Sequence, residues 1–218
     1  MKIVLFGATG MVGRGALLEA LDDDRVRELV IVGRRSCEVR HPKIREVLLR
    51  DFFDFGPARP EFSGVDACLF CLGVSSLGMA EEAYTRVTHD LTLAAARALL
   101  EAGSKPTFCY VSGAGTNANG RAMWARVKGK TENDLLALPL KSAYMFRPAY
   151  IQPRRGVRSK TGWYRIFYAA FGILYPLLRI ALPSLVTSTD VLGRALVRVG
   201  RDGFAKPILE TRDINRIG

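Results

Sequence analysis

Three glycines follow a short apolar run near the start of the chain. The run Ile3–Phe6 is rich in β-branched and aromatic residues, which predicts a strand that is buried on both faces. Gly7 then permits a sharp turn, and Gly10 has no Cβ, so that a pyrophosphate can approach the backbone. Gly13 lets a following helix pack closely on the sheet. Together these residues predict a strand, a turn and a helix that bind a dinucleotide.

The helix after this turn is expected to begin near Met11. Its free N–H groups and the positive end of its dipole then face the phosphates. The alternative is a tight strand–helix turn without a ligand, but the strand before it and the βαβ pattern after it favour the phosphate site. The residues expected to hold the pyrophosphate are Gly7, Thr9, Gly10, Met11 and Val12.

Two arginines follow the next predicted strand, Glu28–Gly33. The end of this strand meets the adenosine ribose in a dinucleotide fold, where an acidic residue suits the 2′-hydroxyl of NAD and arginine suits the 2′-phosphate of NADP. Arg34 and Arg35 therefore favour NADP(H) over NAD(H), because guanidinium groups match phosphate by charge and geometry. A pair of solvated loop arginines is the alternative.

The strongly apolar stretch 65–72 predicts a further strand. Ligands of open α/β sheets bind beyond the carboxyl ends of the strands, so we expect Cys71, Leu72 and Gly73 to lie along the cofactor. Cys68 and Cys71 have the spacing of a redox or metal motif. On a strand, however, residues three apart point to opposite faces, which favours two core cysteines and no metal site.

The glycine spacing, Gly-x-x-Gly-x-x-Gly, resembles that of extended and atypical short-chain dehydrogenases/reductases, and most closely the group around the human Tat-interacting oxidoreductase and its bacterial relatives. The resemblance is strong over the first 130 residues and vague after residue 155. It implies that Asp51, after the strand 44–49, receives the adenine amino group; a surface aspartate is the alternative. It also implies that Ser112, after the strand 106–111, polarises the substrate carbonyl.

The catalytic pair of this family is Tyr-x-x-x-Lys, one helical turn apart. The resemblance gives Lys128 the role of binding the nicotinamide ribose, but the position four residues earlier is Trp124. An indole N–H is a donor without useful acidity near neutral pH, so the usual proton donor is missing. The resemblance also places the loop of Pro148 and Tyr150 beside the nicotinamide, and Tyr150 is our candidate for a substitute acid, together with water.

The last third of the chain carries most of the positive charge. Of the net charge of +11, residues 151–218 contribute +8. A basic stretch at 154–165 precedes a nearly all-apolar stretch at 166–183. We interpret these residues as a lid helix packed on the core, with a membrane-surface segment and a spanning segment as alternatives. Nucleic acid is not expected as a partner, because no binding motif accompanies the charge.

Composition and cysteine content are those of a globular protein. The chain has four cysteines and an N-terminal apolar run that is too short for a signal peptide. These features predict reduced thiols in a cytoplasmic protein. The protein would be peripheral to a membrane if the basic and apolar stretch binds lipid. Asp22, Asp23 and Asp24 are interpreted as a solvated loop. A homodimer and a monomer both stay open.

These patterns predict an α/β fold. We expect a doubly wound parallel sheet, the Rossmann fold, with residues 1–153 as the dinucleotide-binding core and residues 154–218 as a small C-terminal helical lid and the last core elements, in one structural domain. The predicted function is an NADP(H)-dependent oxidoreductase on a small carbonyl or alcohol substrate. The alternative, motivated by Trp124, is a non-catalytic NADP(H)-binding sensor or assembly protein at a membrane surface.

Overall fold

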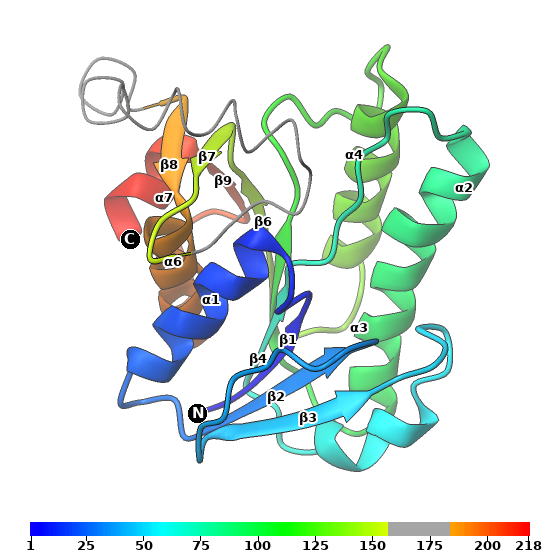
Figure 1. Cartoon of the computed structure of the whole chain (residues 1–218). Coiled ribbons are helices and arrows are strands. Elements are labelled where there is room, and N and C mark those ends of the chain that lie inside the picture. Colours follow the sequence, from blue (N-terminus) through cyan, green and yellow to red (C-terminus); the bar gives the residue numbers. More distant parts are fainter. Residues whose placement is uncertain (157–183) are drawn as a thin grey trace.

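A parallel β-sheet forms the centre of the protein (Figure 1). The computed structural model describes residues 1–156 and 184–218. The strands are β1 (Lys2–Phe6), β2 (Glu28–Gly33), β3 (Ile44–Leu48), β4 (Ala67–Phe70), β5 (Thr107–Val111), β6 (Ser142–Arg147), β7 (Tyr150–Gln152), β8 (Val186–Ser188) and β9 (Ile208–Glu210). Seven of them pair in the order β3-β2-β1-β4-β5-β6-β9, and every pairing is parallel. The short strands β7 and β8 form a separate parallel pair.

Helices cover both faces of the large sheet. They are α1 (Met11–Asp22), the 3₁₀ helix η1 (Gly56–Phe62), α2 (Glu81–Thr85), the π-helical η2 (Arg86–Asp90), α3 (Leu91–Glu101), α4 (Met123–Leu136), α6 (Thr189–Asp202) and α7 (Thr211–Ile217). The strand order reverses between β1 and β4, as in a doubly wound fold. The predicted doubly wound parallel sheet is therefore confirmed.

The core has two halves, and the alternation along β1 separates them. Ile3 and Leu5 pack with α1 and α6 on one face, whereas Val4 and Phe6 pack with η1 and α3 on the other. All four side chains are fully buried. A central strand with apolar residues on both faces is what a parallel sheet between two helical layers requires.

The long helical segment from Glu81 to Glu101 is not uniform. It runs as α2, then the single π-helical turn η2, then α3. A π turn inserts one extra residue and shifts the faces on either side of it, and apolar periodicity alone does not reveal this. Within η2, His89 lies between Asp90 and Asp134, at 2.7 Å from each carboxylate. These two contacts give His89 a structural role between η2 and α4.

The acidic triplet at the end of α1 is exposed at Asp22 and Asp24, as expected of a solvated loop, and differs from that expectation at Asp23. Asp22 is the last residue of the helix, and the side chain of Asp23 is only 14% exposed. Asp23 pairs with Arg25 at 3.0 Å and with Arg201 of α6 at 3.0 Å. Carboxylates are unfavourable at the negative end of a helix dipole, and arginines from other segments offset that cost here.

Glycines allow α1 and α6 to pack closely. A Cβ on Gly15 would lie 2.4 Å from the carbonyl oxygen of Thr189, and one on Gly193 would lie 2.8 Å from that of Gly15. Helix α6, in the C-terminal part of the chain, thus packs against the helix that follows the glycine turn. The predicted lid and membrane contact at 157–183 lie outside the described residues. Among those that are described, no helix is long and apolar enough to span a membrane.

Candidate cofactor and carbonyl site

The glycine turn has the backbone geometry that its sequence predicts. Gly7 has φ +84°, a conformation that side chains rarely tolerate, and its carbonyl oxygen accepts the Gly10 N–H at 2.8 Å. A Cβ on Gly7 would lie 2.8 Å from the backbone carbonyl of Cys71. The end of β1 and the residues after β4 are therefore in direct backbone contact, at the point where the strand order reverses.

A residue without a side chain is favoured at positions 13 and 10 for different reasons. A Cβ on Gly13 would lie 2.1 Å from the carbonyl oxygen of Gly7, so that glycine is needed for α1 to approach the turn. A Cβ on Gly10 would contact only the Gly7 oxygen, at 3.3 Å, and its surroundings are otherwise open. Thr9 is exposed, and Met11 and Val12 form the partly exposed first turn of α1, whose N–H groups have no partner within the helix. This surface fits a pyrophosphate.

A cavity of about 340 Å³ lies beside this turn. Two exposed arginines at the end of β2 form one side of it, and Leu72 lies at another. Its lining residues are Gly7, Ala8, Thr9, Ile31, Val32, Gly33, Arg34, Arg35, Phe52 and Leu72. Among the ion pairs of residues 1–156 and 184–218, none involves Arg34 or Arg35. The cavity thus offers two uncompensated positive charges next to a phosphate-sized turn.

Phe52 is a lining residue that sequence reasoning missed. The Arg34 guanidinium carbon lies 5.9 Å from the centre of its ring, in a cation–π arrangement. Its neighbour Asp51, the predicted adenine contact, is exposed, and its Oδ1 accepts the Phe53 N–H at 2.9 Å. The only sequence signal for Phe52 was its position directly after that aspartate. A flat ring in this position suits an adenine base.

The residues after β4 adjoin the end of β1, and of the three predicted to lie along the cofactor only Leu72 lines the cavity. The Cys71 N–H donates to the carbonyl of Phe6 at 3.0 Å, and Gly73 is exposed with open space around it. Cys68 packs in the core half with α3 and Cys71 in the half with α1, so the two thiols face opposite sides. Burial raises the pKa of Cys71 to about 12, so the group is a thiol, not a thiolate nucleophile.

Ser112 lies in the turn after β5, in contact with a second hydroxyl. Its Oγ is 3.0 Å from Oγ1 of Thr116, and the Thr116 hydroxyl donates to the carbonyl of Gly113 at 2.8 Å. Since the single Thr116 proton is used there, the Ser112 hydroxyl donates to Thr116. Thr116 was not identified from the sequence, and nothing in its local pattern marks it.

Helix α4 brings Trp124 and Lys128 to the same turn. The indole lies against the turn itself, because a Cβ on Gly115 would be 3.6 Å from its Cη2 atom and one on Gly113 would be 4.0 Å from Cζ3. Trp124 is half-buried. One helical turn later, Lys128 Nζ donates to the carbonyls of Val111 at 3.3 Å and Ser112 at 3.2 Å. The structure thus brings Ser112, Trp124 and Lys128 together at the end of β5.

The environment of Lys128 is unusual for a lysine. Burial lowers its pKa to about 8, and the charge of Glu132 one turn along the helix partly opposes that shift. Nζ also lies 5.3 Å from the ring centre of Tyr110. Glu132 itself is buried and forms a two-pronged ion pair with Arg147 at the end of β6, at 3.0 Å and 2.5 Å. This pair fixes α4 against the sheet next to the site.

The loop after β6 joins the site from the other side. The Pro148 carbonyl accepts the Ala114 N–H at 3.0 Å, which ties this loop to the turn of Ser112. The Tyr150 hydroxyl donates to Oε1 of Gln152 at 2.6 Å, and β7 pairs with β8. Tyr150 is therefore already engaged through its proton, which weakens it as a substitute acid.

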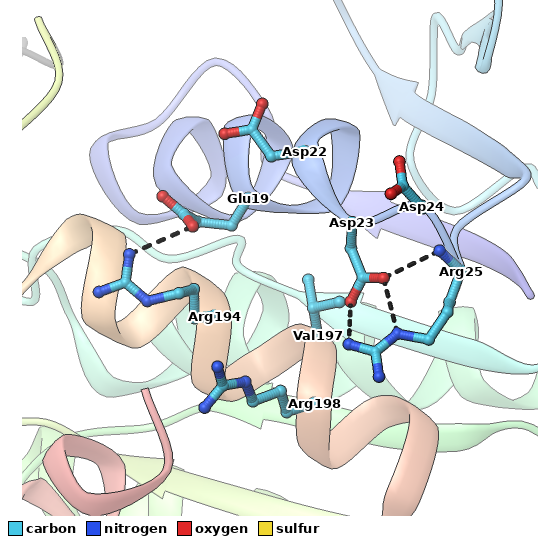
Figure 2. Close-up of a pocket in the computed structure, with 8 residues that line it drawn as sticks. All are labelled: Glu19, Asp22, Asp23, Asp24, Arg25, Arg194, Val197 and Arg198. Carbon is cyan, nitrogen blue, oxygen red and sulfur yellow. Dashed lines mark hydrogen bonds and ion pairs between the residues drawn. The ribbon is translucent and has the colours of Figure 1, made fainter.

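A second cavity, of about 530 Å³, lies away from the glycine turn at the other end of α1 (Figure 2). Carboxylates of α1 face arginines there: Glu19 pairs with Arg194 of α6 at 3.3 Å and with Arg155 at 2.7 Å. Hydrogen bonds and ion pairs to Arg25 and Arg201 hold the pKa of Asp23 at about 2. Since these charges neutralise one another, the cavity is a contact between α1 and α6, and we place the chemistry at the glycine turn.

Known proteins resemble the chain at low identity over most of its length. No family model matches it. It is 27% identical over 156 residues to Protein FMP52, mitochondrial, of Meyerozyma guilliermondii, covering 71% of this chain and 67% of that protein. It is 26% identical over 153 residues to Protein HTATIP2 of Rattus norvegicus, covering 69% of this chain and 62% of that one.

Solved structures show the same fold. A short-chain dehydrogenase/reductase of Saccharomyces cerevisiae matches with a TM-score of 0.69 at 11% identity, covering 100% of this chain and 99% of that one. A dTDP-glucose 4,6-dehydratase double mutant of Streptomyces venezuelae, solved with NAD bound, matches with a TM-score of 0.67 at 17% identity, covering 100% and 80%. The predicted resemblance is confirmed. The chain is thus similar in sequence to FMP52 and HTATIP2, and it has the fold of the solved short-chain dehydrogenase/reductase and dehydratase structures.

The prediction of a cytoplasmic protein is wrong. The FMP52 relatives from several fungi are named mitochondrial, which conflicts with it. The prediction rested on reduced cysteines and a short N-terminal apolar run. Both features report only on the secretory route, and neither distinguishes one reducing compartment from another.

Proposed function

We propose that this short-chain-reductase-like protein is an NADP(H)-dependent oxidoreductase acting on a small carbonyl or alcohol substrate. The observation that carries the proposal is the cavity of about 340 Å³, in which the glycine turn and two arginines without carboxylate partners among the described residues adjoin Phe52. The nicotinamide dinucleotide of the similar dehydratase structure supports the same class of cofactor here.

Each part of the site has a role in this proposal. The turn from Gly7 to Val12 holds the pyrophosphate, and the ring of Phe52, with Arg34 beside it, stacks on the adenine. Arg35 binds the 2′-phosphate. Two of the three Lys128 donors anchor it to the turn of Ser112, which leaves one for the nicotinamide ribose. The cofactor supplies or accepts the hydride.

The substrate carbonyl lies at the turn after β5 in this arrangement. The hydroxyl of Ser112 polarises the carbonyl oxygen once it turns away from Thr116, with which it is paired at 3.0 Å. Polarisation by a fixed hydrogen bond stabilises the negative charge that develops on oxygen during hydride transfer. Water delivers the proton, since the hydroxyl of Tyr150 donates to Gln152.

Hydride transfer itself is the test. The purified protein is incubated with NADPH and a panel of aldehydes, ketones, enones and quinones, and loss of nicotinamide absorbance is followed. We expect oxidation of NADPH with at least one class, and a loss of roughly 10²-fold or more in Lys128→Met, the size of effect that positioning groups produce. If NADPH is not oxidised with any substrate of the panel, the proposal is refuted.

A non-catalytic NADP(H)-binding sensor or assembly protein is the second candidate. The observation that favours it is Trp124, an indole in the place of the catalytic tyrosine, packed against the turn of Ser112. Under this alternative the natural protein transfers no hydride, whereas Trp124→Tyr creates an activity that was absent. Activity of the natural protein in the panel would exclude it.

A further inference from the structure

Among the described residues, the hydroxyl groups of the turn after β5 are committed to partners. The Thr116 proton goes to the Gly113 carbonyl, and the Ser112 proton goes to Thr116. Two Lys128 protons go to the carbonyls of Val111 and Ser112, and the third is the one that the proposed function assigns to the nicotinamide ribose. Trp124 stands where a tyrosine would be, and its indole N–H is not an acid in the useful range. In the part of the chain that the structure describes, the site can therefore donate a hydrogen bond to a developing anion, but the proposed roles leave no tyrosine or other acid at the turn to protonate it.

Substrates differ in how much they need that proton. Reduction of a saturated aldehyde or ketone leaves an alkoxide, whose conjugate acid is about as weak as water, with a pKa of about 15.7. Hydride addition to a conjugated carbonyl leaves an enolate or phenolate, and a phenol has a pKa of about 10. The enolate or phenolate persists in water until solvent protonates it. The lack of an acid in the site therefore slows the formation of this anion far less than the formation of an alkoxide.

The indole also provides a surface for such a substrate. Trp124 is half-buried, and its ring lies along the Gly113–Gly115 turn next to Ser112. Aromatic faces bind flat conjugated groups by offset stacking, and the turn that bears Ser112 has no side chain at either glycine to stand in the way. A flat ligand lying on the indole would be held at the turn that also bears Ser112.

Resting on the proposed NADP(H)-dependent activity, we propose that the site reduces planar conjugated carbonyl compounds, enones and quinones, with Trp124 as the surface on which they stack. The hydride and its electron pair leave the dihydronicotinamide and form a C–H bond at the β-carbon. The C=C pair moves to join the α-carbon and the carbonyl carbon, and the C=O pair moves to oxygen. Ser112 hydrogen-bonds that enolate oxygen, and water then delivers one proton to the product.

A matched pair of ketones tests the proposal. 4-Phenyl-3-buten-2-one is a planar enone, and 4-phenyl-2-butanone has the same skeleton without the double bond. We expect kcat/KM with NADPH to be at least ~10²-fold higher for the enone, in line with the 10²–10⁴-fold that a general acid contributes to alkoxide formation. With deuterium on the transferred position of NADPH, the label should appear at carbon 4 of 4-phenyl-2-butanone, the β-carbon.

Two variants of Trp124 separate stacking from acidity. Trp124→Tyr restores a phenol and should raise the ketone-to-enone ratio of kcat/KM by at least ~10²-fold. Trp124→Phe keeps a ring without the hydroxyl and should not raise that ratio. Binding is read without cofactor: in a Trp163→Phe background, the enone should quench Trp124 fluorescence at lower concentration than the saturated ketone does.

The outcomes are distinct. Equal efficiency with both ketones, deuterium at the carbonyl carbon, or equal quenching by both compounds would overturn the assignment of conjugated carbonyls while leaving an NADP(H)-dependent reductase in place. No oxidation of NADPH with these ketones, with 1,4-naphthoquinone or with any other member of the panel would refute the proposed function, and the conjugated-carbonyl assignment would be refuted with it.

Discussion

Replacing each of three glycines of the cofactor site by alanine should separate folding from cofactor binding. The same methyl group is added each time, but its surroundings differ. On Gly13 it would lie 2.1 Å from the carbonyl oxygen and 2.5 Å from the carbonyl carbon of Gly7. On Gly10 it would meet the Gly7 oxygen at 3.3 Å and nothing nearer. On Gly73 it would meet no atom within 4 Å, which makes that position the matched control.

The expected sizes follow from these distances. Relief of the clash at Gly13 requires α1 to move by about 1 Å against backbone atoms of the turn, and overpacking of this kind costs ~3 kcal/mol, the upper end of its usual range. For a chain of this length that corresponds to a fall in Tm of roughly 6–12 °C. Gly10→Ala should lower the free energy of unfolding by less than ~1 kcal/mol, because its φ of −85° suits any residue. Its methyl group occupies the surface that a pyrophosphate approaches, so the Kd of NADPH should rise at least ~10-fold.

The assay measures thermal unfolding and NADPH titration on the same three variants. Gly13→Ala should lose stability and binding together, Gly10→Ala should lose binding alone, and Gly73→Ala should change the free energy of unfolding by less than ~1 kcal/mol. A Gly10→Ala variant that binds NADPH as tightly as the natural protein would refute the assignment of this turn to the pyrophosphate. A Gly13→Ala variant of unchanged stability would refute the packing argument.

Further predictions concern buried charges. Glu132→Gln should lower the free energy of unfolding by ~3 kcal/mol, because it breaks the buried pair with Arg147, whereas Glu210→Gln, whose carboxylate is half-exposed, should cost under ~1 kcal/mol in chemical denaturation. Burial depresses the pKa of Lys128 to about 8, so the unfolded chain binds more protons than the folded chain between pH 8 and 10.5. The free energy of unfolding should therefore rise with pH over that window. Lys128→Met should abolish this rise in a pH series of denaturation curves. Asp23, with its pKa held at about 2, contributes stability that is present above pH 3.8 and lost towards pH 2. Allowing for solvent screening, Asp23→Asn should lower the free energy of unfolding by ~1 kcal/mol at pH 7 and not at all at pH 2. An equal loss at both pH values would contradict the ion-pair account.

The elements of the sheet could be predicted because their signals are local. The strand at Glu28–Gly33 has the predicted bounds, and the turn at Gly7 has the positive φ that the glycine implied. Apolar runs between turn residues report burial directly, and a parallel sheet needs such runs. The strand predicted at 65–72 is shorter in the structure, Ala67–Phe70, because pairing with β1 and β5 sets its ends.

What the sequence did not reveal depends on contacts between distant residues. The ion pair of Arg155 with Glu19 joins positions 136 residues apart, and neither side chain has a local pattern that announces the other. Arg155 also has a φ of +55°, which local propensity does not predict for arginine. The hydroxyl pair of Ser112 and Thr116 depends on the rotation of a turn, which residue types alone do not specify.

The measurement that tests the central claim most directly is a parallel calorimetric titration with NADPH and NADH. We expect NADPH to bind at least ~10-fold more tightly than NADH. Arg35→Ala should weaken NADPH binding by roughly 10–100-fold, because a charged hydrogen bond to phosphate contributes about 1.5–3 kcal/mol. The same variant should change NADH affinity by less than ~3-fold. Arg40→Ala is the matched control, since this exposed arginine of the same loop is not among the residues that line the cavity. Equal affinity for the two nucleotides, or an equal loss of both in Arg35→Ala, would contradict the assignment of this protein to NADP(H).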